Sequence, residues 1–280
     1  MTREEVRVLI QSLEQVFDVV RLVDGTITEQ YVLDENGELQ QEKYKCYSVW
    51  GREERCKNCI SAKVLSKKEK MTKFEFEDQS VYYVMAQYLE IEGKPFVLEM
   101  IHKNSDETLF SAYGKNKFVE TVLSYNKKIY ADPLTGAYNR QYFEEQIMGF
   151  SHINAVAMLD VDNFKKINDT WGHQVGDEAL KMTAQTVISC IRSRDAMIRY
   201  GGDEFLIVFP EMPVHVFENK LNLIREKCRA IVFEKYPELE VTVSIGGYFG
   251  QGEMMEKIRE ADRMLYGAKE ERDTVKIKFE

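Results

Sequence analysis

Two acidic clusters stand at the ends of predicted strands, where they could bind a metal ion. An apolar run over residues 153–161 contains Asp160 near its end, and Asp203 and Glu204 follow two glycines in the turn of a predicted hairpin at 196–209. Glycine permits positive φ and leaves room for a ligand near the backbone. If the hairpin pairs beside strand 153–161, Asp160 and Asp203 converge, and a hard cation such as Mg²⁺ would relieve their repulsion.

Carboxylates that hold Mg²⁺ are typical of phosphoryl transfer. Metal ions in such sites bridge phosphate oxygens, activate a hydroxyl group and neutralise charge in the transition state. The residues after the first cluster fit this chemistry, because Phe164 and Lys165 open a helix whose N–H groups could bind phosphate beside a cationic side chain. An isolated Gly-Gly-Asp-Glu turn is more often a solvated hairpin, so its neighbours decide the interpretation.

An amide and a carboxylate follow in a connection rich in glycine. Asn168 and Asp177 lie at either end of a stretch that contains Gly172 and Gly176. A carboxylate accepts hydrogen bonds from both N1 and N2 of guanine, a pair of donors that adenine lacks. The stretch therefore fits a guanine nucleotide, with helix capping by the same two side chains as the alternative.

These motifs occur in order within residues 132–280, and this half of the chain resembles the GGDEF family of diguanylate cyclases. The resemblance rests on agreement in five separate segments: Asp132 through Arg140, Asp160 through Asp177, Arg199 through Phe205, Val243 through Gly247, and Ala261 through Lys269.

The resemblance implies a diguanylate cyclase, which joins two GTP molecules into cyclic di-GMP and releases two pyrophosphates. Each protomer of a dimer would bind one GTP, with Mg²⁺ or Mn²⁺ as the cofactor. The resemblance implies these roles: Asp160, Asp203, Glu204 and the carbonyl of Val161 on the metal; Asp160, Lys165, Asp203 and Glu204 in catalysis; Asn168 and Asp177 on guanine; and the backbone of Phe164 with Lys165 and Lys269 on the triphosphate. The carboxylate of Asp177 favours GTP over ATP.

Two further features qualify this expectation. Arg192 and Asp195 have the spacing of the family's Arg-x-x-Asp motif for inhibition by the product, since arginine can bind phosphate bidentately and aspartate can bind a guanine edge. A surface ion pair would use the same two residues. In addition, Glu271-Arg272-Asp273 replaces the family's usual Gly-Arg-Asn, so the expected phosphate-binding arginine falls on Asp273, which would weaken triphosphate binding.

The elements that must position these residues predict two domains and a linker. Residues 132–280 form the predicted GGDEF domain, an α/β (α+β) fold with a mixed sheet flanked by helices, similar to a nucleotide cyclase or polymerase palm. Its predicted elements are helices at 139–150, 163–170, 176–193, 214–235 and 253–271 and strands at 153–161, 196–209 (a hairpin), 240–248 and 274–279.

The first 104 residues predict a small PAS-like α+β sensory domain with an amphipathic helix at 2–17. Its predicted mixed sheet has strands at 18–23, 26–33, 72–77, 80–91 and 95–103, with a helix near 57–69. Residues 105–131 form a predicted helical linker, in which an a/d pattern favours a dimeric coiled coil over a helix packed on its own domain.

The cysteines of the N-terminal half leave three alternatives open. Cys46, Cys56 and Cys59 could be ordinary thiols, could hold a metal if a fourth ligand such as His102 joined them, or could form a redox pair. Cys190 and Cys228 lie on apolar helical faces and are expected in the core. An odd total of five cysteines argues against a disulfide framework.

The bulk composition excludes several classes of function. The net charge of −9, with no basic half, argues against nucleic-acid binding, and no apolar run is long enough for membrane insertion. We expect a cytoplasmic homodimer that binds GTP and cyclic di-GMP and is regulated by its N-terminal domain. The main alternative is a catalytically silent receptor for GTP or cyclic di-GMP that acts through a protein partner; a polymerase or another cyclase would leave the Arg-x-x-Asp motif unexplained.

Overall fold

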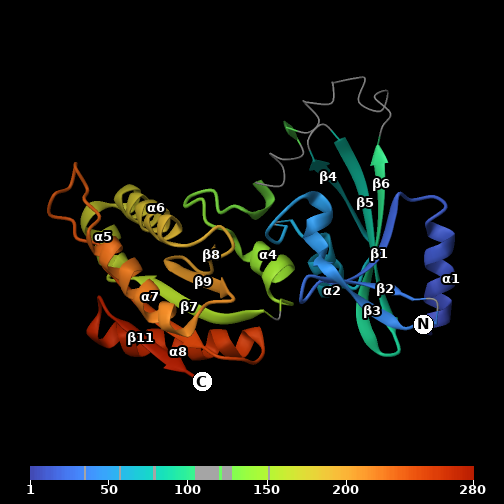
Figure 1. Cartoon of the computed structure of the whole chain (residues 1–280). Coiled ribbons are helices and arrows are strands. Elements are labelled where there is room, and N and C mark those ends of the chain that lie inside the picture. The colour runs from blue at the N-terminus through green and yellow to red at the C-terminus, as the bar shows by residue number, and fades with distance from the viewer. Residues whose placement is uncertain (35, 57, 78–79, 105–119, 122–127, 151) are drawn as a thin grey trace. The chain divides into compact units, whose positions relative to one another are not determined.

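The computed structural model describes the chain except for residues 35, 57, 78–79, 105–119, 122–127 and 151 (Figure 1). The chain divides into two compact units. The first is Met1–Ile129 with Glu144–Phe150, and the second is Tyr130–Phe143 with Ser151–Glu280. Most of the predicted coiled-coil linker at 105–131 lies outside the described residues, so the prediction of a coiled coil is not tested.

The N-terminal unit is built on a six-stranded sheet in the order β3-β2-β1-β6-β5-β4. Every described pairing in it is antiparallel, so the prediction of a mixed sheet was wrong here. Its elements are α1 (Arg3–Leu13), β1 (Val19–Asp24), β2 (Glu29–Leu33), β3 (Leu39–Lys45), the 3₁₀-helix η1 (Cys46–Trp50), α2 (Ile60–Lys67), β4 (Met71–Glu77), β5 (Ser80–Ile91) and β6 (Lys94–Asn104).

Helix α1 begins at a capping box and is shorter than predicted. The side chain of Thr2 accepts from the N–H of Glu5, whose side chain accepts from the N–H of Thr2. The helix ends at Leu13 instead of residue 17, and Val16, which lies within the predicted helix, is 68% exposed. The apolar spacing therefore continued past the point where packing supports the helix.

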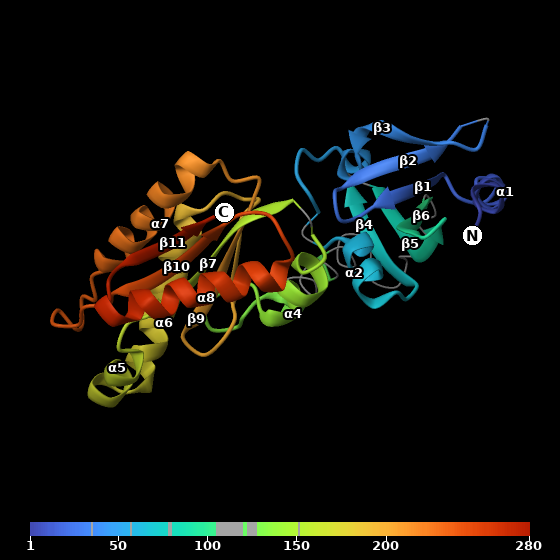
Figure 2. The same cartoon turned by 90° about the horizontal axis from the view of Figure 1, so that it is seen from below.

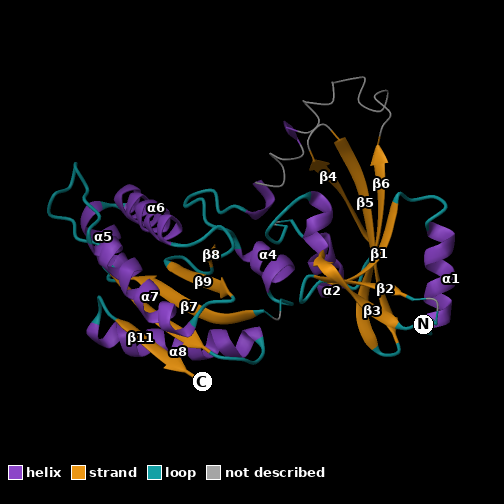
Figure 3. Cartoon of the chain, in the orientation of Figure 1, coloured by secondary structure: helices purple, strands orange, loops and turns teal. Residues whose placement is uncertain are grey.

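The C-terminal unit contains helices and a sheet (Figure 3), and the sheet has five strands in the order β11-β10-β7-β9-β8. β10 and β11 are parallel and the other neighbours antiparallel, which confirms the mixed sheet. Its elements are α4 (Arg140–Tyr142), the π-helix η3 (Phe143–Ile147), β7 (Ile153–Val161), α5 (Phe164–Trp171), α6 (His173–Cys190), β8 (Ala196–Arg199), β9 (Glu204–Pro210), α7 (Val214–Arg229), β10 (Val243–Phe249), α8 (Met254–Glu271) and β11 (Val275–Phe279). The last four residues of η3 belong to the first unit.

Two predicted helices of this half end differently from the prediction. The helix predicted at 139–150 is three residues of α-helix followed by the π-helical turn η3. The helix predicted at 214–235 ends at Arg229, because the residues beyond it bring Phe233 into the core, with Ile231 and Tyr236 packed against it. Apolar side chains past a helix end were thus mistaken for its continuation.

The strand β7 carries side chains to both faces of the sheet. Ala157, Leu159 and Val161 pack in the core that contains residues of α6 and α7. Since successive side chains of a strand point to opposite faces, Asp160 points to the other face, which α8 covers (Figure 2). One strand therefore contributes to the core and to the acidic site.

A pair of glycines fixes how closely the two helix layers approach the sheet. A Cβ atom on Gly246 would lie 2.0 Å from the backbone nitrogen of Leu265 in α8. A Cβ atom on the next residue, Gly247, would meet side-chain atoms of Leu221 and Phe217 in α7 instead. Helix α8 thus lies against bare backbone at Gly246, which places its C-terminal end over the tip of β7.

Among the described residues, no helix has the length and apolar character needed to cross a membrane.

Candidate active site

The pairing of β7 with β9 brings the two acidic clusters together. Asp160 is directly opposite Glu204 in the antiparallel register. The N–H of Val161 donates to the carbonyl of Asp203 at 3.4 Å, and the N–H groups of Tyr200 and Gly201 both donate to the carbonyl of Glu204. The hairpin therefore pairs beside strand 153–161 as predicted, and its turn closes against the tip of β7.

The first glycine of the turn lies close to a carboxylate of the acidic pair. A Cβ atom on Gly201 would lie 2.8 Å from Oε2 of Glu204, so the carboxylate of Glu204 lies over the bare backbone of the turn. This close approach is a different use of glycine from the positive φ that the sequence suggested, because Gly201 and Gly202 are not among the residues with positive φ.

An arginine that the sequence analysis gave no role braces the turn. Nε and Nη2 of Arg199 donate to the carbonyl of Gly202 at 3.0 and 2.7 Å. Nη1 donates to the carboxylate of Asp132 at 3.2 Å, which also accepts from the N–H and hydroxyl of Thr135. Burial raises the pKa of Asp132, but the hydrogen bonds from Thr135 and the charge of Arg199 lower it overall. The ion pair between Arg199 and Asp132 thus joins two of the five segments that resemble the GGDEF family.

Asp160 forms an ion pair with Lys269 of α8. The distance from Nζ to Oδ2 is 2.8 Å, and the Asp160 side chain is only 8% exposed. Burial raises the pKa of Asp160 to about 6; Lys269 opposes this rise, whereas the charges of Asp203 and Glu204 add to it. Burial lowers the pKa of Lys269, but its bond to Asp160 outweighs burial and the pKa is raised. Three carboxylates and one ammonium therefore share this edge of the sheet.

The chemistry of these donors suits a hard divalent cation. Asp160, Asp203 and Glu204 offer carboxylate oxygens, and the charges of Asp203 and Glu204 add to the rise that burial causes in the pKa of Asp160. Across the described residues, no three carboxylate, imidazole or thiol side chains are arranged as a ready coordination shell. Mg²⁺ does not require one, because it is commonly bound through one or two carboxylates together with waters and substrate phosphates.

The helix after β7 presents its N-terminus close to the acidic cluster. Asn163 adopts the left-handed conformation, with φ of 54°, and no side chain caps the first turn of α5. Its carbonyl accepts from the N–H of Ile167. Phe164 is half-buried and Lys165 is exposed at the start of the helix. The N–H groups and the cationic side chain predicted to bind phosphate are therefore available there.

The two residues predicted to contact guanine lie on consecutive helices that pack against each other. Asn168 is in α5 and is half-buried, whereas Asp177 is in α6 and is exposed. The chain turns between them at Gly172, whose φ is 88° and whose N–H donates to the carbonyl of Asn168 at 2.9 Å. The N-terminus of α6 has no side-chain cap, so neither Asn168 nor Asp177 caps this helix.

The predicted product site is a closed ion pair. Nη2 of Arg192 lies 2.8 Å from Oδ1 of Asp195, and the backbone N–H of Arg192 also donates to this carboxylate. The Asp195 side chain is fully buried and that of Arg192 is 33% exposed. The alternative use of these residues, an ion pair with each other, is thus the arrangement found.

Asp273 pairs with two arginines of α7. Its carboxylate accepts from Arg229 at 3.0 Å, and its carbonyl accepts from Arg225 at 2.8 Å. Its N–H donates to Asp162, which also accepts from two hydroxyl groups of the adjoining segment and strand. The acidic residue at the position of the expected arginine is therefore held by positive charge from a different helix.

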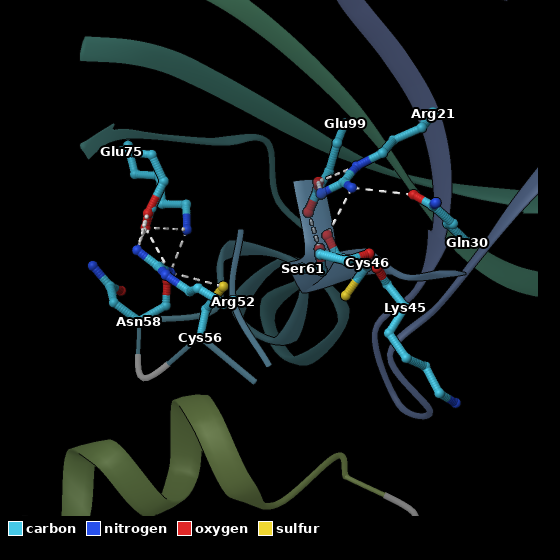
Figure 4. A network of polar contacts seen from close by, with 12 residues as sticks. Arg21, Gln30, Lys45, Cys46, Arg52, Cys56, Asn58, Ser61, Glu75 and Glu99 are labelled. Atoms are coloured by element: carbon cyan, nitrogen blue, oxygen red, sulfur yellow. Dashed lines mark hydrogen bonds and ion pairs between the residues drawn. The ribbon is translucent and has the colours of Figure 1, made fainter. Parts of the chain in front are cut away.

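Cys46 and Cys56 lie in a network of polar contacts of the N-terminal unit (Figure 4). Arg21 and Glu99 form an ion pair of 2.6 Å, Arg21 donates to the carbonyl of Cys46, and Arg52 donates to the sulfur of Cys56 at 3.0 Å. Burial raises the pKa of both Cys46 and Cys56, which favours ordinary thiols.

The remaining cysteine predictions have mixed outcomes. All five cysteines are free. Cys228 is fully buried, which confirms its place in the core, and Cys190 packs partly buried against that core. His102, the candidate fourth ligand, lies 3.1 Å from Asp18, with both side chains more than half exposed.

Curated proteins with similar sequences include enzymes of cyclic di-GMP synthesis. The chain is 39% identical over 145 residues to the uncharacterized protein YtrP of Bacillus subtilis, covering 49% of this chain and 24% of YtrP. It is 28% identical over 188 residues to the diguanylate cyclase DgcM of Escherichia coli K12, covering 65% of this chain and 43% of DgcM. The chain therefore spans less than half the length of these relatives.

Solved structures resemble the chain at the level of the fold. The coiled coil and GGDEF domain of DgcB from Caulobacter crescentus, in complex with c-di-GMP, has a TM-score of 0.53 and 27% identity, covering 58% of this chain and 93% of that one. The diguanylate cyclase SiaD from Pseudomonas aeruginosa, in complex with its activator SiaC, has a TM-score of 0.51 and 30% identity, covering 59% and 67%.

The family model described as diguanylate cyclase, GGDEF domain, matches residues 129–274, just over half of the chain. This range contains β7, the acidic turn, the helices α5 and α6, and Lys269 of α8. On this match and on the geometry of the site, the chain belongs to the GGDEF family of diguanylate cyclase domains.

Proposed function

We propose that this chain condenses two GTP molecules into cyclic di-GMP and releases two pyrophosphates. The observation that carries the proposal is the register of β7 and β9, which sets Asp160 against Glu204 and closes the Asp203 turn on Val161. A hairpin turn that was merely solvated would need neither the buried Asp160 nor its lysine partner in α8. The 3′-hydroxyl of each GTP attacks the α-phosphorus of the other, so the reaction needs two nucleotides face to face.

The residues of the site divide the work of binding and proton transfer. Asp160, Asp203 and the carbonyl of Val161 would hold Mg²⁺ or Mn²⁺, which when bound offsets the charge of the triphosphate and of the transition state. Glu204 lies beside them as a further ligand or as the acceptor of the proton from the attacking hydroxyl. Proton removal by a carboxylate requires only that the carboxylate reach the hydroxyl at hydrogen-bond distance.

The nucleotide would lie across the N-terminus of α5. The first N–H groups of α5, from Phe164 onward, and the ammonium groups of Lys165 and Lys269 are the donors for the triphosphate. The carboxamide of Asn168 and the carboxylate of Asp177 read the guanine edge, which selects GTP over ATP. Since Lys269 already binds Asp160, it would move to phosphate when a cation takes its place.

A turnover assay tests the proposal. The full chain is incubated with GTP and Mg²⁺, and the product is identified by mass. Asp203→Asn and Glu204→Gln should each lower turnover at least about a hundredfold, in the range measured when a group that stabilises the transition state is removed. Glu211→Gln is the matched control, because Glu211 directly follows the other end of β9 and is 65% exposed. GTP binding without any cyclic product, under conditions where the chain is dimeric, would overturn the enzyme and favour the receptor.

The two units suggest separate roles. We assign catalysis to residues 132–280, sensing to residues 1–104 and dimer formation to the linker 105–131. The antiparallel sheet with α2 supports a PAS-like sensory domain, since it contains the predicted three-stranded run β4, β5 and β6. A rate that grows with the square of protein concentration below the dimer dissociation constant would support the homodimer, and a linear dependence would contradict it. GTP as the substrate fits the expected cytoplasmic location.

Inhibition by the product is proposed at Arg192 and Asp195. The closed pair adds a condition, because cyclic di-GMP must replace the bonds between Arg192 and the buried carboxylate of Asp195. We therefore expect Arg192→Ala to remove inhibition by added cyclic di-GMP while turnover at low product is kept. Equal inhibition of the parent and the variant would show that the product binds elsewhere or not at all.

A further inference from the structure

Gly176 has no conformational reason to be glycine. It is the fourth residue of α6, its φ is not positive, and its N–H donates to the carbonyl of Gly172 at 3.2 Å. Glycine inside a helix is less favourable than alanine by roughly 1 kcal/mol. A glycine that the backbone does not require, at a buried position in a helix, indicates that something lies where a side chain would be.

What lies there is the carboxamide of Asn168. A Cβ atom on Gly176 would be 1.9 Å from Oδ1 and 2.9 Å from Cγ of Asn168. It would also lie 3.3 Å from Cε2 of Phe164. The side chain of Asn168 therefore lies directly on the bare backbone of α6, and no methyl group fits between the two helices unless this carboxamide moves.

The contact ties together two residues of the proposed nucleotide site. The side chain of Asn168 is held against α6 at Gly176, and Gly176 directly precedes Asp177. Asp177 is exposed on α6. The turn at Gly172 joins α5 to α6, and its N–H binds the carbonyl of Asn168, so the backbone of Asn168 is fixed as well. The bare backbone at Gly176 thus sets how closely the Asn168 carboxamide approaches α6 beside the residue that precedes Asp177.

We propose that Gly176 is a positioning residue for recognition of the guanine base. Its missing side chain lets the Asn168 carboxamide stand beside Asp177, so that the two groups meet one edge of the base together. The inference rests on the proposed function, because it takes Asn168 and Asp177 as the groups that bind guanine. Gly176 itself does not touch the nucleotide.

The test is a pair of single variants with their double variant, made in the full chain. Gly176→Ala should raise the KM for GTP about tenfold with kcat changed less than about twofold, since loss of one hydrogen bond to a base typically costs about that factor. Asn168→Ala should raise KM by a similar factor. In the Asn168→Ala background, Gly176→Ala should add less than about a twofold change, because the group it displaces is gone.

A matched control separates this effect from the general cost of the substitution. Gly267 also lies inside a helix without positive φ, and a Cβ atom there meets only the flexible end of Lys276, at 3.3 Å. Gly267→Ala should leave KM unchanged. Preference for GTP over ATP should fall in Gly176→Ala and stay in Gly267→Ala, which a loss of stability alone would not produce.

Several results would overturn the proposal. A KM for Gly176→Ala equal to the parent's would do so, as would a fall in kcat at constant KM. An equal rise in KM on Gly176→Ala in the presence and in the absence of the Asn168 side chain would also overturn it. If Gly176→Ala alone does not fold, the double variant should fold, and its failure also counts against the proposal. If the parent forms no cyclic di-GMP, the proposed reaction fails, and GTP dissociation constants of the same variants decide the positioning role by the same comparison.

Discussion

The close approach of α8 to β10 predicts a large effect for the replacement of Gly246 by alanine. The added Cβ atom would lie 2.0 Å from the nitrogen of Leu265 and 2.2 Å from the carbonyl oxygen of Ala261, both in the backbone of α8. For the shorter contact to reach 3.4 Å, α8 must move by about 1.4 Å. Because backbone cannot rotate out of the way, we expect a loss of about 3 kcal/mol, the upper end for overpacking.

The same shift should impair the site, since α8 carries Lys269. A displacement of about 1 Å at a catalytic group can lower the rate about a hundredfold. We therefore expect Gly246→Ala to lower kcat/KM for GTP by about that factor when it is folded. The ion pair between Lys269 and Asp160, now 2.8 Å, would be lost or lengthened.

Gly247→Ala is the matched control, because the next residue of β10 faces the other helix layer. Its Cβ atom would be 2.7 Å from Cδ1 of Leu221 and 3.1 Å from Cε1 of Phe217, which are side-chain atoms and not backbone. We expect a cost of about 1 kcal/mol there, with activity largely kept. Urea denaturation measures the free energy of unfolding, and cyclic di-GMP formation measures activity. Equal losses in the two variants would refute the reasoning, as would full activity of Gly246→Ala.

Three further predictions concern charges. Because the pKa of Asp160 is raised to about 6, protons compete with the cation below that pH. The Mg²⁺ concentration for half-maximal activity should therefore rise about tenfold per pH unit as the pH falls from about 6 to 5. An Mg²⁺ requirement that did not depend on pH would contradict this. Glu99→Gln removes the negative charge that pairs with the buried Arg21 and should cost about 3–5 kcal/mol in urea denaturation, whereas Glu92→Gln, in an exposed pair, should change little. Equal effects would count against burial as the cause. Arg199→Gln frees the acidic turn and should lower kcat about tenfold at unchanged circular dichroism; an unchanged kcat would show that the turn holds without it.

The geometry of the acidic site could be predicted because its determinants are local. An apolar run that ends in a carboxylate and a hairpin with a glycine turn both have short-range signals, and the pairing of β7 with β9 follows from burying two apolar strands side by side. The three strands β4, β5 and β6 were found for the same reason, since alternation and a turn separate them.

Elements and contacts without a local pattern of apolar residues in the sequence escaped prediction. The strand β3 reads Leu-Gln-Gln-Glu-Lys-Tyr-Lys, is mostly exposed, and forms only because β2 offers it an edge. The π-helical turn η3 has no signal in sequence spacing. The brace between Arg199 and Asp132 joins residues 67 positions apart, and neither residue type alone indicates that partner.

The roles expected at Arg192, Asp195 and Asp273 depend on side-chain choices that a motif does not record. The same spacing that suits a bound product also suits the ion pair found between Arg192 and Asp195. The negative charge at Asp273 is compensated by Arg229, 44 positions away in the chain. Motif spacing therefore identified the residues, and the structure shows that other side chains of the chain are their partners.

The bond between Lys269 and Asp160 gives the chain an internal counterion. Without one, the three carboxylates at this edge would repel each other with no positive charge between them. With it, the Lys269 ammonium offsets one of the three negative charges, and in the proposed mechanism a metal ion that displaced this ammonium would free it for the triphosphate. We expect metal and nucleotide to bind cooperatively for this reason, each lowering the concentration at which the other saturates the site.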